Sequence, residues 1–295
     1  MRKAAVMNER KPDADPGVAA GSRRTSFESY MRFLAEAPRD GTPVVLETET
    51  ALSLHFDVLA TQSFMSRRDP DRLVLGYTRT MMGFLLLHPS PARISVIGLG
   101  GGSLVKYCYR HLPATRVVAV EIDPAVIALR ERFRIPPDDV RLQVVCADGA
   151  EYVRGREARP EVILVDGFLA DGMPLQLGSA GFYAACHARL ADDGMLVANF
   201  LASDRGMPHY LGAVRAVFGA SMSVARAEDS CNYTLFAWKG PPRLPSLQTL
   251  LARARALEAV HALKLTPTAR RMKRGEAVAA DPDAWHALAR PRDTL

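Results

Sequence analysis

Seven apolar segments of strand length follow residue 94, and they constrain the fold more than any other feature of the chain. The first five are "ISVIG", "RVVAVEI", "RLQVVCA", "EVILVDG" and "GMLVANFL", and they alternate with segments of helical period. This alternation predicts a parallel sheet that helices cover on both faces. Only "EDSC" separates the last two segments, "SMSVARA" and "NYTLFAWK". Because four residues cannot form a crossover helix, we expect an antiparallel hairpin there.

The rest of the chain divides around this α/β body. The 295 residues are 48% hydrophobic, enough for one large core and a smaller unit. "PVVLETETALSLHFD" and "VLATQSFMS" predict a small antiparallel sheet, and residues 73–87 predict a helix. We expect the last thirty residues to be poorly ordered. The expected parts are a disordered basic leader (1–26), an N-terminal β-rich domain with a linking helix (27–90), the α/β domain (91–240), and a C-terminal helix and tail (241–295).

Charge and cysteine content exclude several classes of protein. The net charge of +6 is concentrated in "RKAAVMNERK", "SRRT" and "ARRMKRGEA", which favours solvated tails over a nucleic-acid surface. Four widely spaced cysteines form no CxxC pair, so we expect a reduced, cytoplasmic protein without a disulfide framework or a zinc site. The apolar runs are far shorter than the roughly 20 residues that cross a membrane. The N-terminus lacks the apolar stretch of a secretory signal.

A glycine cluster in "ISVIGLGGGSLVKYCYR" joins the first of these strands to a helix. Gly98, Gly100, Gly101 and Gly102 permit a sharp turn and the close approach of a ligand to the backbone. The helix that begins near Ser103 favours partial negative charge at its N-terminus. The alternative is a tight strand-to-helix turn without a ligand.

Acidic residues follow the next three strands and make a nucleoside site the better interpretation. Glu121 ends the second strand, where a carboxylate can accept hydrogen bonds from two ribose hydroxyls of NAD or of an adenosyl sulfonium. The GxGxxG frame has Ser103 at its sixth position, which weakens the match to NAD. Asp148 can receive an adenine amino group, cap a helix, or do both. Asp166, after the fourth strand, could be a charge partner or general base, or could brace its loop.

Five parallel strands that end in a hairpin resemble the sheet of S-adenosylmethionine-dependent methyltransferases. With the N-terminal sheet included, residues 43–240 resemble the spermidine and spermine synthases, the polyamine aminopropyltransferases. The resemblance implies an α/β fold in which a small N-terminal antiparallel β-domain precedes a methyltransferase-like, Rossmann-like, mostly parallel seven-stranded sheet. The domain over 91–240 would then be the catalytic domain.

The resemblance also implies residue roles. The glycine turn would bind the cofactor, and Gln62 of "ATQSF" would contact the nucleoside. Glu121 of "VEID" would hold the ribose, while Asp148 and Gly149 of "ADG" would hold the adenine. Asp166 of "LVDGF" would accept the proton from the attacking amine.

The polyamine half of the expected site departs from the family pattern. Gly101 stands where "GGGDGG" has its aspartate, and Leu169 replaces the second aspartate of "DSSDP". In the linking helix, Tyr77 is followed by Thr78 instead of His or Gln. Burying an ammonium without a paired carboxylate is unfavourable by several kcal/mol. Asp171 is a candidate replacement and, with Tyr77, a candidate substrate residue. Asp204 and Glu228 are further acidic candidates, for which a solvated surface charge is the favoured interpretation.

We therefore expect a cytoplasmic transferase that uses S-adenosylmethionine or its decarboxylated form as co-substrate, without a metal. Its acceptor would be a small-molecule amine or another nucleophile, and it would form a homodimer or homotetramer without membrane contact. Nucleic acid is an improbable partner. The alternatives are a small-molecule methyltransferase and a non-catalytic nucleoside-binding scaffold.

Overall fold

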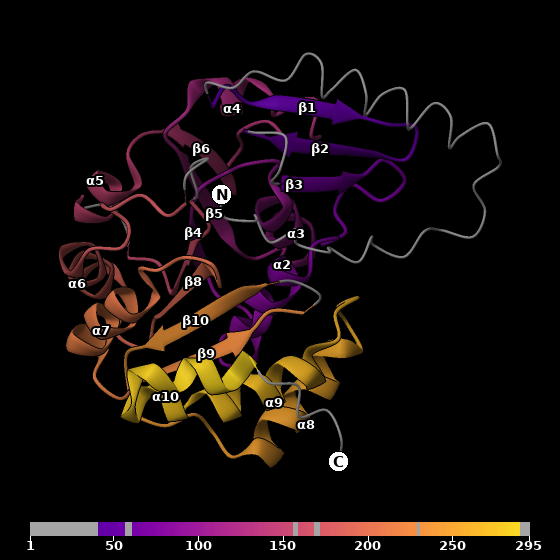
Figure 1. Ribbon diagram of the computed structural model, residues 1–295. Coiled ribbons are helices and arrows are strands. Elements are labelled where there is room, and N and C mark those ends of the chain that lie inside the picture. The colour runs from indigo at the N-terminus through magenta and orange to yellow at the C-terminus, as the bar shows by residue number, and fades with distance from the viewer. Residues whose placement is uncertain (1–40, 57–60, 156–158, 168–171, 229–230, 290–295) are drawn as a thin grey trace, which may run out of the picture.

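An antiparallel three-stranded sheet forms the N-terminal part of the described chain. The computed structural model describes residues 41–56, 61–155, 159–167, 172–228 and 231–289. The expected leader therefore lies outside the described residues. The sheet has the order β1-β2-β3 and confirms the predicted small antiparallel sheet (Figure 1). Its strands are β1 (Val44–Glu47), β2 (Ala51–His55) and β3 (Thr61–Ser66).

A second sheet of seven strands carries the main body, in the order β6-β5-β4-β7-β8-β10-β9. Five neighbouring strands are parallel, and β10 is antiparallel to both β8 and β9. The predicted parallel sheet and terminal hairpin are thus confirmed. The strands are β4 (Arg93–Ile97), β5 (Arg116–Glu121), β6 (Leu142–Cys146), β7 (Val162–Val165), β8 (Met195–Leu201), β9 (Met222–Arg226) and β10 (Asn232–Trp238).

Both faces of this sheet are buried. Successive residues of a strand point to opposite sides of the sheet, so each strand contributes to the apolar core on either side. In β7, Val162 and Leu164 belong to one apolar core, and Ile163 and Val165 belong to the other. The first core includes residues of the N-terminal sheet and of α2, α3, α8 and α9 (Figure 1). The second core includes residues of α5, α6, α7 and α10. Five of the helices connect strands of the sheet: α3 (Ser103–His111), α4 (Pro124–Ala128), α5 (Gly149–Arg154), α6 (Ala180–Arg189) and α7 (Met207–Phe218).

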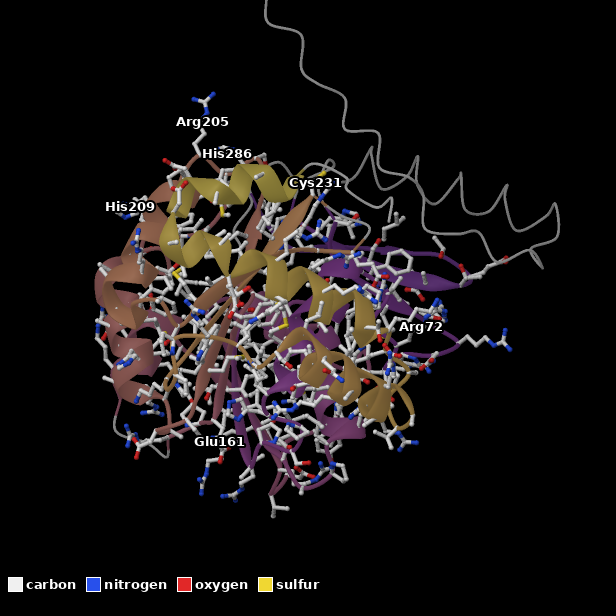
Figure 2. The ribbon with its side chains drawn as sticks, turned by 90° about the horizontal axis from the view of Figure 1, so that it is seen from below. Arg72, Glu161, Arg205, His209, Cys231 and His286 are labelled. Carbon is white, nitrogen blue, oxygen red and sulfur yellow. The ribbon has the colours of Figure 1, made fainter. Side chains whose placement is uncertain are left out.

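The C-terminal residues are helical as far as position 289, so the expectation of thirty poorly ordered residues was wrong. Leu265, Ala269 and Met272 recur at helical spacing and are buried in the first core. "ARRMKRGEA" therefore lies mostly in a packed helix rather than in a solvated tail. These helices lie across the sheet in the view from below (Figure 2). They are α8 (Leu247–Glu258), α9 (Leu265–Gly275), α10 (Ala277–Ala280) and a final 3₁₀ helix (Pro282–Ala289).

The linking helix is shorter than the 73–87 span that the sequence predicts. α2 covers Gly76–Met81, and Met82–Leu86 continues it as a 3₁₀ helix. Within that tighter segment, a Cβ atom added at Gly83 would lie 2.9 Å from Thr268 of α9. The close approach of the C-terminal helix accounts for the glycine. Within the ranges described above, no helix combines the length and the apolar character needed to span a membrane.

Candidate active site

The glycine turn between β4 and α3 packs directly on the end of β7. Gly98 has φ +93°, and a Cβ atom there would lie 2.3 Å from the carbonyl oxygen of Asp166. Gly100 and Gly102 also have positive φ, at +50° and +69°. Only glycine adopts this backbone without strain. The turn therefore keeps a bare backbone at the carboxyl edge of the sheet, where ligands bind in open α/β folds.

The room around Gly101 is closed by two other parts of the chain. A Cβ atom at Gly101 would lie 2.6 Å from Ser63 Oγ of β3 and 2.8 Å from the ring of Phe133. Phe133 is fully buried, and the buried Lys106 ammonium donates to its carbonyl oxygen at 2.7 Å. Burial lowers the pKa of Lys106 to about 8. No acidic side chain occupies position 101, and the neighbouring ring and hydroxyl take up the space next to it.

Glu121 at the end of β5 is tied to the glycine turn. Its Oε2 accepts a hydrogen bond from the backbone N–H of Leu99 at 2.9 Å, and its Oε1 accepts one from Asp123 N–H at 3.0 Å. Each oxygen keeps a further lone pair for another donor. Next to it, Ile122 is an exposed isoleucine with 55% of its surface accessible.

Asp148 caps α5 with one oxygen only. Its Oδ1 accepts hydrogen bonds from the backbone N–H groups of Ala150 at 2.6 Å and Glu151 at 3.1 Å. The capping geometry leaves Oδ2 for another donor. Gly149 follows at the start of the helix, where a Cβ atom would lie 2.3 Å from the side chain of Ile97. The helix end thus approaches the β4 strand closely.

Asp166 follows β7 and lies between side chains from distant parts of the chain. Tyr77 of α2 donates its hydroxyl to Oδ2 at 3.1 Å, and Asn199 of β8 donates its side-chain N–H to Oδ1 at 2.9 Å. The low solvation of the carboxyl group raises its pKa to about 6, although these two hydrogen bonds act to lower it. The same burial, together with the Asp166 charge, raises the pKa of Tyr77, which therefore stays a neutral donor.

Sequence reasoning missed Asn199 and Asn232. Asn199 is only 2% exposed, and its Oδ1 accepts a hydrogen bond from the Asn232 side-chain N–H at 2.9 Å. The polar residue within the apolar strand "GMLVANFL" was a signal for Asn199. No comparable signal marks Asn232, because it stands at the first position of β10 beside a loop.

The other residues selected from the sequence lie at varied distances from this cluster. Gln62 is half-buried in β3, and the Tyr77 hydroxyl lies 3.5 Å from its backbone oxygen. Asp171 lies outside the described residues. Glu228 pairs with Arg79 of α2 at 3.0 Å, so the expectation of a freely solvated charge was wrong for it. Asp204 accepts hydrogen bonds from Gly206 N–H at 2.7 Å and from the Tyr210 hydroxyl.

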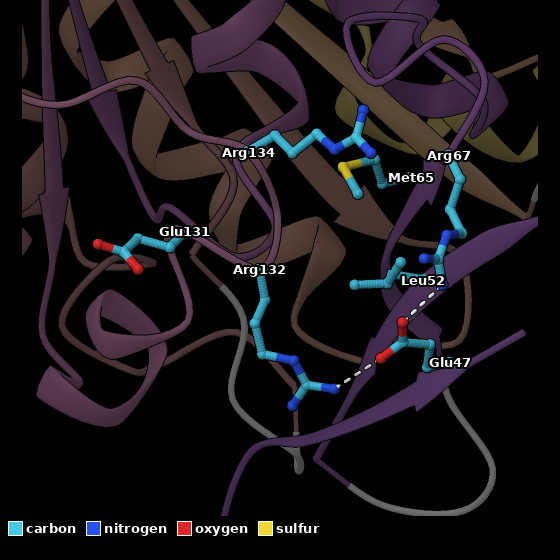
Figure 3. Close-up of a pocket in the computed structure, with 7 residues that line it drawn as sticks. All are labelled: Glu47, Leu52, Met65, Arg67, Glu131, Arg132 and Arg134. Atoms are coloured by element: carbon cyan, nitrogen blue, oxygen red, sulfur yellow. Dashed lines mark hydrogen bonds and ion pairs between the residues drawn. The ribbon is translucent and has the colours of Figure 1, made fainter.

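A separate cavity of about 170 Å³ lies between the N-terminal sheet and the segment 131–134 (Figure 3). Inside it, Glu47 accepts hydrogen bonds from Arg67 at 2.5 Å and Arg132 at 3.2 Å, which lower the Glu47 pKa. The cavity does not contain the residues selected from the sequence. Across the described ranges, no three His, Cys, Asp or Glu side chains are grouped so that they could hold a metal ion.

This sheet order, with a glycine turn and an acidic residue at or just beyond the end of each of the next three strands, defines the Rossmann-like fold of the methyltransferase type. The sequence model of the spermine/spermidine synthase domain matches residues 74–202. A polyamine aminopropyltransferase from Neisseria meningitidis is 35% identical over 213 residues, which cover 72% of this chain and 81% of that protein. The chain therefore belongs to the spermine/spermidine synthase family of transferases.

Two solved structures extend the comparison. A probable spermidine synthase from Corynebacterium glutamicum aligns with a TM-score of 0.60 over 72% of this chain and 84% of its own, at 20% identity. That likeness shows the shared fold. Human methyltransferase-like protein 13, in complex with SAH, is 30% identical and aligns with a TM-score of 0.53, over 66% of this chain and 89% of its own.

Proposed function

We propose that this chain transfers an aminopropyl group from decarboxylated S-adenosylmethionine to an amine acceptor, with Asp166 as the proton acceptor. The observation that carries the proposal is the position of Asp166 beside the glycine turn, held by Tyr77 and Asn199. A carboxyl group whose pKa lies near 6 is ionised at neutral pH and is still basic enough to take a proton. The family relationship supports the same reaction.

The nucleoside half of the proposal rests on two carboxylates. Glu121 offers both oxygens toward ribose hydroxyls, since each already accepts only one backbone hydrogen bond. Asp148 offers Oδ2 toward an adenine amino group while Oδ1 caps α5. The bare backbone of Gly98, Gly100 and Gly102 allows the sulfonium end to approach, and Gln62 and Gly149 complete the proposed surface.

The proposed reaction has one displacement step. The ammonium of the acceptor gives a proton to the Asp166 carboxylate, and the freed nitrogen lone pair attacks the propyl carbon bound to sulfur. The carbon–sulfur bond breaks as the carbon–nitrogen bond forms, and its electron pair stays on sulfur. Neutral methylthioadenosine leaves. Orientation and proton removal supply the acceleration that this chain's residues can give.

Incubation with decarboxylated S-adenosylmethionine and a panel of amines, followed by mass spectrometry, tests the proposal. We expect methylthioadenosine together with an aminopropylated amine. If nucleoside binds but no amine yields methylthioadenosine, aminopropyl transfer is refuted. The non-catalytic scaffold is then supported if no other transfer product forms either.

The surroundings of Gly101 favour methyl transfer as a second candidate. The family aspartate that would pair with a donor ammonium is absent, and Ser63 and Phe133 fill the adjoining space. Without that anion, the carboxylate of S-adenosylmethionine meets no repulsion from position 101. The 30% identical human methyltransferase-like protein is consistent with this donor. Calorimetry with the carboxylated and decarboxylated donors separates the two candidates, and S-adenosylhomocysteine would be the product of methyl transfer.

The reaction rate should rise with pH through the titration of Asp166. Below pH 6 the carboxyl group is protonated and cannot accept a proton, so kcat/KM should increase as the pH passes about 6 and then level off. Rate profiles between pH 5 and pH 9 measure this, with Asp192→Asn as a control because Asp192 is an exposed carboxylate that pairs with Arg159. A rate that stays constant between pH 5 and pH 7, as an ordinary aspartate with a pKa of about 4 would give, would contradict the assignment.

Glu121→Gln should weaken nucleoside binding. The carboxamide has one acceptor oxygen instead of two, so either a backbone N–H or a ribose hydroxyl loses its partner. Loss of a charged hydrogen bond predicts an affinity for methylthioadenosine lower by about 10- to 100-fold. Calorimetry measures it, with the exposed Glu151→Gln as control. Equal affinity of the variant and the native protein would exclude Glu121 from the site.

A further inference from the structure

We propose that Asn232 is a positioning residue, which orients the side-chain amide of Asn199 so that its N–H group, and not its carbonyl oxygen, faces Asp166. This inference rests on the proposed function, in which Asp166 accepts a proton. In the described part of the chain, the donors to the Asp166 carboxyl group are Tyr77 and Asn199, so Asn232 acts on it through Asn199.

The antiparallel pairing of β8 and β10 places the two asparagines together. Asn199 lies opposite Thr234, and Asn232 lies opposite Leu201. Asn199 and Asn232 are therefore diagonal neighbours on one face of the strand pair, within reach of each other's side chains. Because β10 runs against β8, its first residue lies at the carboxyl edge of the parallel strands. An antiparallel strand thus reaches the edge that carries Asp166.

An asparagine amide beside a carboxylate has one productive orientation. Its N–H group donates to the ionised carboxylate and stabilises it. Its carbonyl oxygen is an acceptor, so in the flipped orientation two acceptors would face each other and no hydrogen bond would form. Asn199 is almost fully buried, so few water molecules can compensate for the wrong orientation. The Asn232 N–H group donates to Asn199 Oδ1 at 2.9 Å and so turns the Asn199 N–H group toward Asp166.

Among the described residues, few other groups compete for control of this carboxyl group. From α2, the Tyr77 hydroxyl donates to Oδ2, while Arg79 of the same helix is paired with Glu228. The glycine turn contributes no titratable side chain, and Asp204, beyond β8, is held by Gly206 and Tyr210. The pKa of Asp166 therefore depends on two opposing effects: burial raises it, and the hydrogen bonds from Tyr77 and Asn199 lower it.

Carbon-13 NMR of protein labelled at the aspartate carboxyl carbons tests the proposal without requiring turnover. Asp166→Asn identifies the Asp166 signal by its loss. In Asn232→Leu, the Asp166 titration midpoint should rise by about one pH unit, because the amide is no longer held in the stabilising orientation. Thr234→Val is the matched control: Thr234 is on the same strand face, and its buried hydroxyl has no hydrogen-bond partner among the described residues.

A double-mutant comparison shows whether Asn232 acts through Asn199. Asn199→Leu should raise the midpoint at least as much, and adding Asn232→Leu to it should produce no further shift. If Asn199→Leu does not fold, the comparison of Asn232→Leu with Thr234→Val still decides. An unchanged midpoint in folded Asn232→Leu, or additive shifts in the double variant, would overturn the proposal.

Kinetics add a second readout if the proposed reaction is observed. Asn232→Leu should be about fivefold slower near pH 6 and should approach the native rate near pH 8.5, where Asp166 is ionised in both proteins. Equal slowing at every pH would indicate a merely structural role and would count against the proposal. A shifted NMR midpoint in a protein that yields no methylthioadenosine would reject the proposed function and retain the positioning role.

Discussion

Asp166→Asn is expected to lower the rate of aminopropyl transfer by roughly 10³-fold, the middle of the range for a positioned proton acceptor. The asparagine keeps the size of the side chain but cannot take a proton from the acceptor amine. Nucleoside affinity should stay near the native value, because Glu121 and Asp148 lie at the ends of other strands. Single-turnover rates and calorimetry measure the two quantities separately.

The same variant should not be less stable, which separates lost chemistry from misfolding. Burial raises the Asp166 pKa from 3.8 to about 6, so the ionised form is the disfavoured one in the folded protein. The stability associated with the raised pKa is present below pH 4 and is lost as the pH rises through about 6. At pH 8, a neutral asparagine should therefore increase the free energy of unfolding by about 1–2 kcal/mol. If Asp166→Asn retained the full rate of aminopropyl transfer, Asp166 would not be the proton acceptor.

Gly98→Ala should damage both stability and ligand binding. The methyl carbon would lie 2.3 Å from the Asp166 carbonyl oxygen and 2.9 Å from Gly167 Cα, and these are backbone atoms that cannot rotate away. The φ of +93° adds strain for any residue with a side chain. Together these effects should lower the free energy of unfolding by about 3 kcal/mol or more. Chemical denaturation measures the loss.

Gly212→Ala is the matched control for a glycine substitution. Gly212 lies inside α7, and an added Cβ atom would meet nothing within 4 Å. Alanine there should stabilise the protein by about 0.5–1 kcal/mol, because it has the higher helix propensity. If Gly98→Ala were as stable as the native protein, the close packing of the glycine turn on β7 would be refuted.

Local patterns predicted the sheet well because strand burial leaves a direct trace in the sequence. The strands from "ISVIG" to "NYTLFAWK" are apolar because helices cover both faces, and the length of "EDSC" fixes the hairpin. Asp148 also has the predicted helix cap, with both hydrogen bonds on one oxygen. Helix α9 was not predicted, because the charges of "ARRMKRGEA" obscured the regular spacing of Leu265, Ala269 and Met272.

Contacts across long sequence separations could not be predicted in this way. Tyr77 reaches Asp166 over 89 positions, and Asn199 reaches Asn232 over 33. Similarly, the sequence places Phe133 in an unremarkable segment, yet its ring lies against Gly101. No local sequence pattern predicts these contacts, because they depend on the order of the strands in the sheet.

The position of β10 between β8 and β9 has a consequence for how the chain is made. β10 follows β9 in the sequence, so β8 has no neighbour on that side until Asn232–Trp238 has left the ribosome. Before then, β8 is an open apolar edge, which is a template for pairing with other chains. A nascent or truncated chain that stops before Trp238 would therefore be prone to aggregate, and chaperone protection matters most during that interval of synthesis.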